Sequence, residues 1–523
     1  MTKDKSEMEQ LYDLVNRVTE RHKQWQEDFD IIVVTPMFGG SSTPGDVDEQ
    51  FPIRSSSVRG HLRFWWRATR GARCENEVDL KKREAAIFGD TDQPSRVKIW
   101  VEHPEDSQKF KPQSILKKEG KKTRFTKDLS DNVYDYDYAY VLFPFRDGKT
   151  SKHNTRSQFS NNNSLLNDRN AAPYYYPNYQ FKLWIKYHIE SPMEGIGSDE
   201  VRTHELQRYK EEIYAALWAW INFGGIGART RRGCGSLYCP EFSPKLGQWF
   251  KNDKDIANWF NNGLEKYKIQ LLSRNEIRPW TTLTSQILLQ PRKQPITCAW
   301  LQTIKAYREF RSRRPDRQKT TRRPGRSYWP EADSIRKLTG MAVQKHKKPL
   351  TISDAPEDYA FPRAVFGLPI ITHFRSDSKD QRIEKHEREP YTTELKPKKK
   401  DRLASPLITK SIAVSREQGY GAVIILKQPE LGELELSIAD KDAKNHDNEA
   451  ITRDVEKKLK DNVINDRHIY TPVVTYNHLE NNPMVKEVEV YKSTGETYKS
   501  AIDAFLASKE IKRWKTSNYN NRK

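Results

Sequence analysis

The chain alternates between apolar runs of strand length and longer stretches with helical periodicity. Residues 29–35 (FDIIVVT) form a continuous apolar run that ends at Pro36, as is typical of a buried strand. Residues 179–190 (YQFKLWIKYHIE) alternate apolar and polar side chains, which predicts a strand with one buried face. The same kind of pattern predicts helices over 7–26, 55–71 and 205–222, and strands over 96–102 and 236–239.

From residue 29 onward these elements follow the order β, α, β, β, α, β, which is the order of a ferredoxin-like domain of the RRM type. A weaker series of the same kind occupies the second half of the chain. Its predicted elements cover residues 282–290, 296–310, 364–373, 403–414, 421–427 and 497–514. The sequence therefore predicts an α+β protein with two ferredoxin-like (RRM-type) βαββαβ domains in tandem, long charged insertions and an N-terminal helix.

Changes in composition set the expected domain boundaries. We expect a helical extension over 1–28, then a first domain over 29–245 that carries a polar insertion at about 103–170. A helical spacer over 246–280 leads to a second domain over 281–523. That second domain carries a basic insertion at about 305–330 and a charged insertion at about 428–470.

The helix over 55–71 (SSSVRGHLRFWWRATRG) has two distinct faces. At about 100° per residue, one arc collects a core face of Val58, Leu62, Trp65, Trp66 and Thr69. A neighbouring arc collects an arginine ridge of Arg59, Arg63, Arg67 and Arg70, while Ser55, Ser56 and Ser57 offer N-cap oxygens. No acidic residue lies between Phe51 and Arg73, so the partner of the ridge is not local in sequence. It is either a carboxylate elsewhere in the fold or a phosphate, and Trp66 is the better placed tryptophan for stacking on a base.

A glycine-rich loop follows the helix predicted over 205–222. Its glycines come after a helix and before a strand, which is the reverse of a dinucleotide-binding fingerprint. The loop is either a helix C-cap with a bulged strand entry, or a flexible backbone that approaches a sugar-phosphate chain. Its glycines and arginines are Gly225, Gly227, Gly233, Gly235, Arg229, Arg231 and Arg232.

Charge and aromatic content point to a polyanionic partner. The 523-residue chain has a formal net charge of +20, and 11% of its residues are aromatic. Basic and aromatic side chains together are typical of proteins that bind single-stranded nucleic acid. Ten basic and two acidic residues lie between Lys305 and Arg326, which predicts either a basic arm that binds RNA, with Arg313 and Arg314, or a solvated loop.

Metal and cofactor motifs do not emerge from the pattern. The four cysteines form no CxxC pair, so we expect free thiols, no metal and no cofactor. The first ten residues mix charges of both signs and the apolar runs are short, which favours a cytoplasmic protein without a signal peptide.

Three motifs in combination resemble the RAMP superfamily of CRISPR proteins, and within it the first RAMP subunit of type III-B (Cmr) effector complexes. They are Thr35–Gly40 (TPMFGG), Pro52–Arg67 (PIRSSSVRGHLRFWWR) and Gly225–Gly235 (GIGARTRRGCG). Residues 361–370 (FPRAVFGLPI) and 402–408 (RLASPLI) also resemble that subunit. The resemblance implies two ferredoxin-like domains in a ribonucleoprotein with sister Cmr subunits, CRISPR guide RNA and complementary target RNA. It also implies a place at the 3′ part of the guide, in antiviral defence, and binding rather than cleavage.

We therefore expect a non-catalytic RNA-binding subunit. Its expected contacts with RNA are Arg54, Ser56, Arg59, Arg63, Trp66, Arg67, Gly225, Gly227, Arg229, Arg231, Arg232, Gly233, Gly235, Arg313 and Arg314. One alternative is a RAMP-type endoribonuclease that matures the guide without a metal, with His61 in acid–base catalysis. Another alternative is a scaffold whose arginines meet acidic patches of sister subunits.

Overall fold

The protein was analysed as a computed structural model. The residues that it describes are 12, 25–39, 48, 50–105, 113–114, 116–119, 122–125, 141, 174–175, 178–189, 199–273, 275–312, 326–353, 358–374, 388–439, 449–470, 482–486 and 497–516. The chain divides into two compact units. Unit 1 comprises Met1–Gly148, Leu166–Thr303 and Ile408–Gln428, and unit 2 comprises Lys149–Leu165, Ile304–Leu407 and Pro429–Lys523.

Unit 1 contains a four-stranded antiparallel sheet in the order β2-β7-β1-β8. Its strands are β1 (Gln26–Val33), β2 (Val97–Glu102), β7 (Gln180–Tyr187) and β8 (Leu237–Tyr238). Helix α2 (Ser55–Thr69) lies between β1 and β2 along the chain, and α7 (Asp199–Phe223) lies between β7 and β8. This sheet therefore has the βαββαβ connectivity that the sequence predicts for the first domain.

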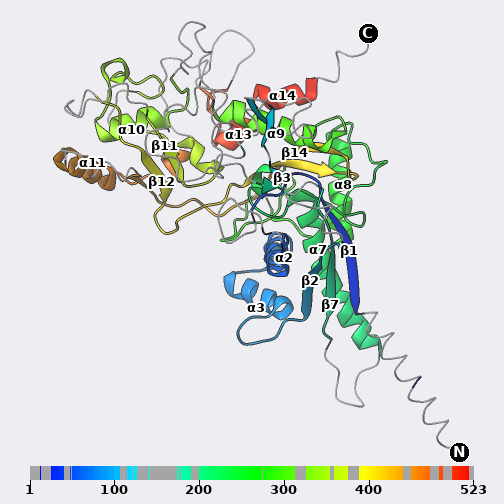
Figure 1. The fold of residues 1–523 in the computed structure, drawn as a ribbon. Helices are drawn as coiled ribbons and strands as arrows, with labels where there is room; N and C mark the ends of the chain where they lie inside the picture. Colours follow the sequence, from blue (N-terminus) through cyan, green and yellow to red (C-terminus); the bar gives the residue numbers. More distant parts are fainter. Residues whose placement is uncertain are drawn as a thin grey trace, which may run out of the picture. The chain divides into compact units, whose positions relative to one another are not determined.

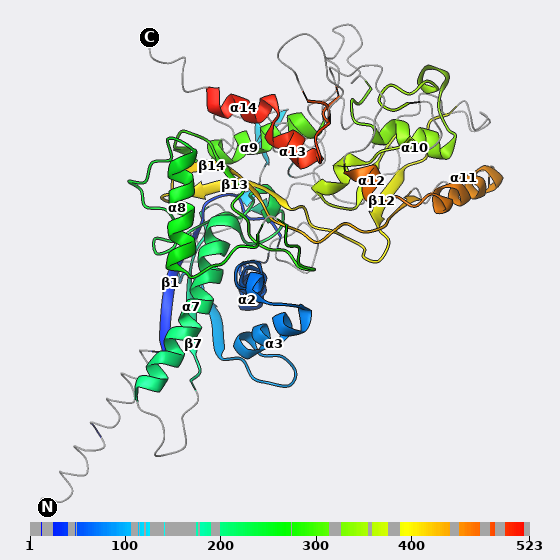
Figure 2. The same ribbon diagram turned by 180° about the vertical axis from the view of Figure 1, so that it is seen from behind.

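The core of unit 1 lies between one face of this sheet and its helices. Strand β7 alternates strictly between partly exposed and buried residues, so Phe181, Leu183 and Ile185 point inward. They join the buried side chains of α2 and α7 in one hydrophobic cluster. Figures 1 and 2 show α7 running along β1 and β7, with α2 beside it. The opposite face of β2 and β7 carries partly or fully exposed side chains.

Two further helices complete unit 1. Helix α3 (Glu77–Phe88), which the sequence reading missed, begins at Asn76, whose side chain accepts the backbone N–H groups of Val78 and Asp79. Helix α8 (Asp253–Lys266) lies within the predicted spacer and begins with an Asn252–Asp255 capping box. Its Phe260 ring packs 5.8 Å from the ring of Trp218 in α7.

The second predicted domain does not form as expected. In unit 1, β10 (Gln294–Pro295), β14 (Gln418–Ile425) and β13 (Leu407–Ala413) form a sheet, with β9 (Ile287–Leu289) also paired to β14. The predicted strand over 364–373 instead becomes a 3-10 turn, Pro362–Phe366, followed by the short β11 (Ile370–Thr372). Strand β11 belongs to a separate sheet in unit 2, in the order β11-β12-β15, with β12 (Thr393–Pro397) and β15 (Leu434–Ile438). Pro362 and Pro369 lack the N–H groups of a sheet ladder, which limits the strand there. The α+β class is confirmed, and the tandem arrangement is not.

The remaining described elements are helices and two short strand pairs. Helix α9 (Ile296–Arg311) matches the helix predicted over 296–310. Unit 2 also contains α10 (Glu331–Thr339), α11 (Glu449–Asp461), α12 (Asp466–Ile469), α13 (Ala501–Leu506) and α14 (Lys509–Thr516). Within the predicted insertion, β3 (Gln113–Ser114) pairs with β6 (Tyr174–Tyr175), and β4 (Leu116–Glu119) pairs with β5 (Lys122–Phe125). The predicted N-terminal helix lies largely outside the described residues.

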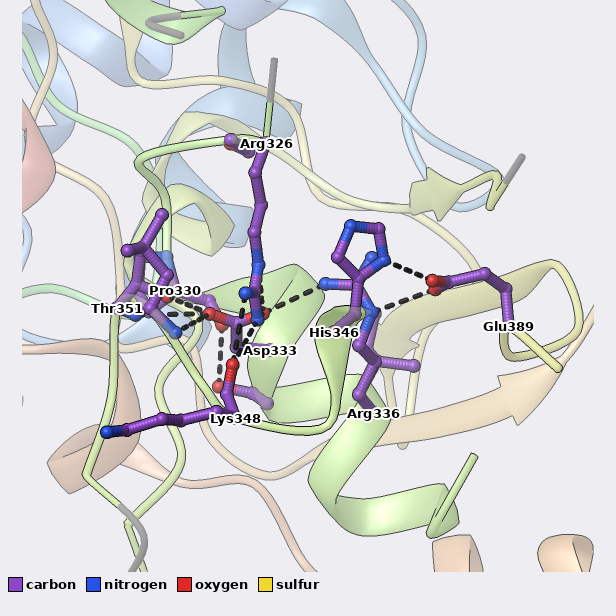
Figure 3. A network of polar contacts seen from close by, with 12 residues as sticks. Arg326, Pro330, Asp333, Arg336, His346, Lys348, Thr351 and Glu389 are labelled. Atoms are coloured by element: carbon purple, nitrogen blue, oxygen red, sulfur yellow. Dashed lines mark hydrogen bonds and ion pairs between the residues drawn. The ribbon is translucent and has the colours of Figure 1, made fainter. Parts of the chain in front are cut away.

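A buried polar network centred on Asp333 holds the start of α10 in unit 2 (Figure 3). Its Oδ1 accepts Arg326 Nη2 at 2.6 Å and Arg336 Nη1 at 2.9 Å. Its Oδ2 accepts the backbone N–H groups of Leu350 and Thr351 and the Thr351 hydroxyl. Asp333 lies inside the first turn of α10 and is only 3% exposed.

Candidate nucleic-acid interface

Helix α2 has the buried face that its sequence predicts. Val58, Leu62, Trp65, Trp66 and Thr69 are all buried, and Ala68 joins them. The expected serine cap is wrong, since the N-cap residue is Arg54 and makes no side-chain capping bond. Ser55 Oγ instead accepts the backbone N–H of Val101 at 3.1 Å, which ties the start of α2 to strand β2.

Two arginines of the ridge share one carboxylate from α3. Arg63 Nε and Arg67 Nη1 each lie 2.6 Å from Glu84 Oε1, and Glu84 is only 6% exposed. The side chains of Arg63 and Arg67 remain 38% and 33% exposed. One carboxylate balances only one of their two positive charges, so the pair keeps a net positive charge at the surface. Sequence reasoning missed Glu84. The sequence does contain a signal for it. Glu84 lies four positions after Leu80 and three before Ile87, so it falls on the apolar face of the helix, where an acidic side chain needs a partner.

The two ends of the ridge differ. Arg59 donates to the Phe88 carbonyl and to Ser95 Oγ at 3.3 Å, and partial burial, together with the charge of Arg63, lowers its pKa. Arg70 does not belong to the ridge, because it is 1% exposed and donates to the backbone carbonyls of Lys268 and Glu211, each at 2.9 Å. The ridge is therefore Arg59, Arg63 and Arg67, all three partly exposed, and we call these three residues the exposed ridge.

Trp66 is not available for base stacking. Its side chain is fully buried, and its indole N–H donates to Glu212 Oε2 at 2.7 Å. A buried indole with a satisfied donor is a core residue. Trp66 is therefore a core residue, and the expectation that it stacks on RNA is wrong.

His61 packs against the core helix α7. Its ring stacks on the Trp220 ring with centroids 6.0 Å apart, and burial lowers its pKa to about 4. A histidine with this pKa is neutral at physiological pH and has little acid to offer there. This geometry suits a packing role better than the nuclease role considered for it.

The glycines of the loop are required by contacts inside the chain. Gly235 has φ of +62°, and a Cβ on it would lie 1.9 Å from the Ile226 carbonyl oxygen. A Cβ on Gly227, which has φ of +81°, would lie 2.6 Å from the Phe38 carbonyl oxygen. Gly225 and Gly233 are likewise crowded by backbone atoms. The close approach expected for a sugar-phosphate chain is made instead by the turn after β1, since Gly235 N–H donates to the Pro36 carbonyl at 3.0 Å.

Lys410 on strand β13 fixes the entry to the loop, and sequence reasoning missed it. Its ammonium is fully buried and donates to the carbonyl of Gly224 at 2.7 Å and to that of Ile221 at 3.3 Å. These carbonyls end α7, so Lys410 acts as a C-terminal cap from a distant strand. Burial lowers its pKa to about 7.

The loop and α2 meet at Arg231. Its guanidinium lies 5.2 Å from the centre of the Phe64 ring on α2. Burial and the neighbouring Arg232 lower the pKa of Arg231 to about 10, and its buried Nη1 has no hydrogen-bond partner. Two basic segments far apart in sequence are thus brought together, as the sequence reading expects. Arg229 Nε donates to the Val141 carbonyl at 3.1 Å, within the predicted insertion.

The remaining candidate residues differ in exposure. Ser56 and Gly227 are exposed, and the side chain of Arg54 is 46% exposed with a 2.8 Å ion pair to Asp48. Arg232 is 8% exposed, and its carbonyl accepts the Trp300 indole N–H at 2.6 Å. Arg313 and Arg314 lie outside the described residues.

Among the described residues, the structure shows neither a metal site nor a membrane-spanning helix. In the described ranges no three histidine, cysteine, aspartate or glutamate side chains come together as metal ligands would. No described helix is long and apolar enough to cross a membrane.

Comparison with known proteins places the chain in a family. The sequence pattern of the RAMP superfamily matches residues 30–238. The CRISPR system Cmr subunit Cmr1-2 of Pyrococcus furiosus is 30% identical over 211 residues, which are 40% of this chain and 92% of that subunit. Subunit Cmr1-1 of the same organism is 28% identical over 221 residues, which are 42% of this chain and 48% of that subunit.

Two solved structures are similar at lower identity. The crystal structure of Cmr1 from Pyrococcus furiosus in its apo form is 19% identical, with 77% of this chain and 88% of that chain covered and a TM-score of 0.35. The cryo-EM structure of the Type III-B Cmr-beta bound to cognate target RNA contains a chain that is 14% identical, with 83% and 98% covered and a TM-score of 0.39. Because nearly the whole length of a 30% identical Cmr1 subunit is matched, the chain belongs to the Cmr1 family of the RAMP superfamily and is a Cmr subunit of a CRISPR system.

Proposed function

We propose that the chain is an RNA-binding, non-catalytic subunit of a type III-B CRISPR RNA-guided effector complex. In this proposal it holds the 3′ part of the guide RNA, or the guide–target duplex, in antiviral defence. The observation that carries it is the meeting of the basic helix α2 with the arginine-bearing glycine loop at Arg231 and Phe64. The net charge of +20 and the membership in the Cmr1 family both support it. Its partners would be other Cmr subunits, guide RNA and target RNA.

The chemistry of this interface suits phosphate groups. Arginine presents a planar fork of donors that matches phosphate oxygens, and the exposed ridge carries three such forks on consecutive turns of α2. Arg231 adds a guanidinium beside Phe64 of α2, and its buried Nη1 has no hydrogen-bond partner. The interface proposed here therefore comprises Arg54, Ser56, Arg59, Arg63, Arg67, Gly227, Arg229 and Arg231.

Replacing Arg54 by alanine tests the exposed end of this interface with little risk to the fold. Its ion pair with Asp48 is at the surface and contributes at most about 1 kcal/mol. We expect affinity for a CRISPR guide RNA to fall several-fold and the slope of log affinity against log salt to become shallower by about one. A filter-binding titration at several salt concentrations measures both.

The matched control is Arg416→Ala, which removes an exposed arginine from the turn between β13 and β14. If both arginines weaken RNA binding equally, the effect is general charge and the interface is misplaced. If Arg54→Ala leaves RNA affinity intact and loosens assembly with sister subunits, the scaffold alternative is favoured.

Replacing Glu84 by glutamine tests whether the ridge faces RNA. The change releases Arg63 and Arg67 from their shared carboxylate, so we expect tighter guide-RNA binding and a steeper salt dependence. The free energy of unfolding should fall by about 1–3 kcal/mol, because a buried charged hydrogen-bond acceptor is lost. Glu77→Gln, on the exposed start of α3, is the control and should change neither binding property. Unchanged RNA affinity in Glu84→Gln would count against contact between the ridge and RNA.

A further inference from the structure

The outer face of β2 and β7, on the side of the sheet opposite α2, carries a cross-strand ladder of aromatic and basic residues. Register places Trp100 directly opposite Trp184, and Lys98 directly opposite Lys186. We refer to these four residues as the outer ladder. Their neighbours along the strands, Val97, Leu183 and Ile185, point to the core on the other side. The outer ladder is therefore separate from the interface at α2.

The two tryptophans form a preorganised stacked pair, with Lys98 Nζ 5.8 Å from the centre of the Trp100 ring and Lys182 Nζ 5.7 Å from the centre of the Trp184 ring. Their rings are stacked with centroids 5.8 Å apart and an interplanar angle of 3°, and both side chains are partly exposed. The Trp184 indole N–H donates to Glu102 Oε2 at 2.6 Å, which fixes the orientation of that ring. An aromatic pair held on a sheet face is the arrangement on which single-stranded bases stack in sheet-based RNA recognition.

The basic part of the outer ladder places two like charges directly opposite each other, and one of them, Lys98, lies over the Trp100 ring. Like charges directly opposite each other on a sheet are destabilising, and Lys98 faces Lys186 in this way. By contrast, Lys182 on the same face pairs with Asp28 at 2.6 Å. Neither lysine of the outer ladder has a salt bridge to any residue that the structure describes. Arg96 and the exposed His188 lie near Lys98 and Lys186 in the chain. Burial lowers the pKa of His188, and the positive charges of Lys186, Lys98 and Arg96 lower it further.

We propose that the outer ladder is a second RNA-contact surface, specific for unpaired nucleotides. Bases stack on the Trp100–Trp184 pair, and the adjacent phosphates lie against Lys98 and Lys186. The anion relieves the repulsion between the two lysines, which explains why the sheet carries a pair that destabilises it. A protein partner would need to match both the aromatic pair and two lysines that have no salt bridge to the described residues, and a single strand of RNA supplies both matches in consecutive nucleotides.

The double variant Lys98→Gln/Lys186→Gln gives a test with two readouts of opposite sign. In the full chain, affinity for a 20-nucleotide single-stranded uridine RNA should fall about tenfold, with a salt slope shallower by about two. The melting temperature should stay the same or rise, because a like-charge pair is removed. A purely structural role of the lysines predicts a lower melting temperature and unchanged affinity, and that result overturns the proposal. Lys254→Gln, exposed on α8, is the control.

The variant Trp100→Leu tests the stacking part. We expect about a tenfold loss of affinity for the single-stranded uridine RNA and little change for a perfectly paired RNA duplex of the same length, whose bases are not free to stack. Equal losses for both RNAs overturn the assignment to unpaired nucleotides. Loss of assembly with sister Cmr subunits at unchanged RNA affinity overturns it in favour of a protein-docking surface.

These outcomes are distinguishable from failure of the proposed function. If Arg54→Ala weakens guide-RNA binding and the outer-ladder variants do not, only the second surface is refuted. If the outer-ladder variants weaken single-stranded RNA binding and Arg54→Ala does not, the second surface stands while the interface at α2 fails.

Discussion

Replacing Gly235 by alanine is expected to destabilise unit 1 severely. The backbone at this residue is left-handed, with φ of +62°, and the new Cβ would lie 1.9 Å from the Ile226 carbonyl oxygen. That oxygen belongs to backbone held by the hydrogen bond from Ile226 N–H to the Gly235 carbonyl at 2.9 Å, so it cannot move aside without losing the loop. We expect a loss of at least about 4 kcal/mol in the free energy of unfolding, measured by urea denaturation followed by tryptophan fluorescence.

The matched control is the same substitution at Gly60. This glycine lies in the exposed middle of α2, and a Cβ there would meet nothing within 4 Å. Alanine should therefore stabilise the protein by about 0.5–1 kcal/mol through helix propensity. Comparable effects of the two substitutions would contradict the close backbone contacts described for the glycine loop.

Replacing Asp333 by alanine is expected to disrupt unit 2. The change leaves Arg326, Arg336 and three donors from residues 350 and 351 without their shared acceptor in a buried site. Removal of one partner from a buried ion pair costs about 3–5 kcal/mol. Asp461→Ala, at an exposed position in the same unit, should change the free energy of unfolding by less than about 0.5 kcal/mol.

The same network predicts a sign for the pH dependence. Burial alone would raise the pKa of Asp333, but the charge of Arg326 and the hydrogen bonds to its carboxylate outweigh burial and lower it. A carboxyl group with a lowered pKa in the folded state contributes stability above its unfolded pKa and loses that contribution as pH falls. Wild-type unfolding should thus become easier below about pH 4, and Asp333→Ala should remove part of that dependence. An identical acid profile in the variant would show that Asp333 is not a charged centre.

Local periodicity was enough to predict the first sheet and the two faces of α2. The positions Val58, Leu62, Trp65 and Thr69 follow from helical geometry alone, and all four are buried. The alternation of β7 likewise predicted its inward side chains. These features depend on residues within a few positions of each other, and a sequence displays them directly.

Contacts between distant segments were the part that the sequence did not reveal. Glu84 neutralises part of the ridge from another helix, and Arg70 turns into the core, where the carbonyls of Lys268 and Glu211 accept its donors. The glycines of the loop suggested a contact with a ligand. In the structure they allow the loop backbone to pack against the turn after β1, almost two hundred residues earlier, where the Thr35 hydroxyl donates to the Gly233 carbonyl. The prediction of a second ferredoxin-like domain did not hold for a related reason. A pattern of apolar residues predicts a strand, but it does not show which sheet that strand joins.

The most direct test of the central claim is photocrosslinking of the full chain to a CRISPR guide RNA that carries 4-thiouridine in its 3′ part. The account predicts crosslinked peptides from residues 51–67 and 223–235, which form the two sides of the proposed interface. Replacing Arg54 and Arg231 by alanine should reduce those crosslinks. A guide RNA that crosslinks efficiently elsewhere on the chain and not to these two segments would contradict the account.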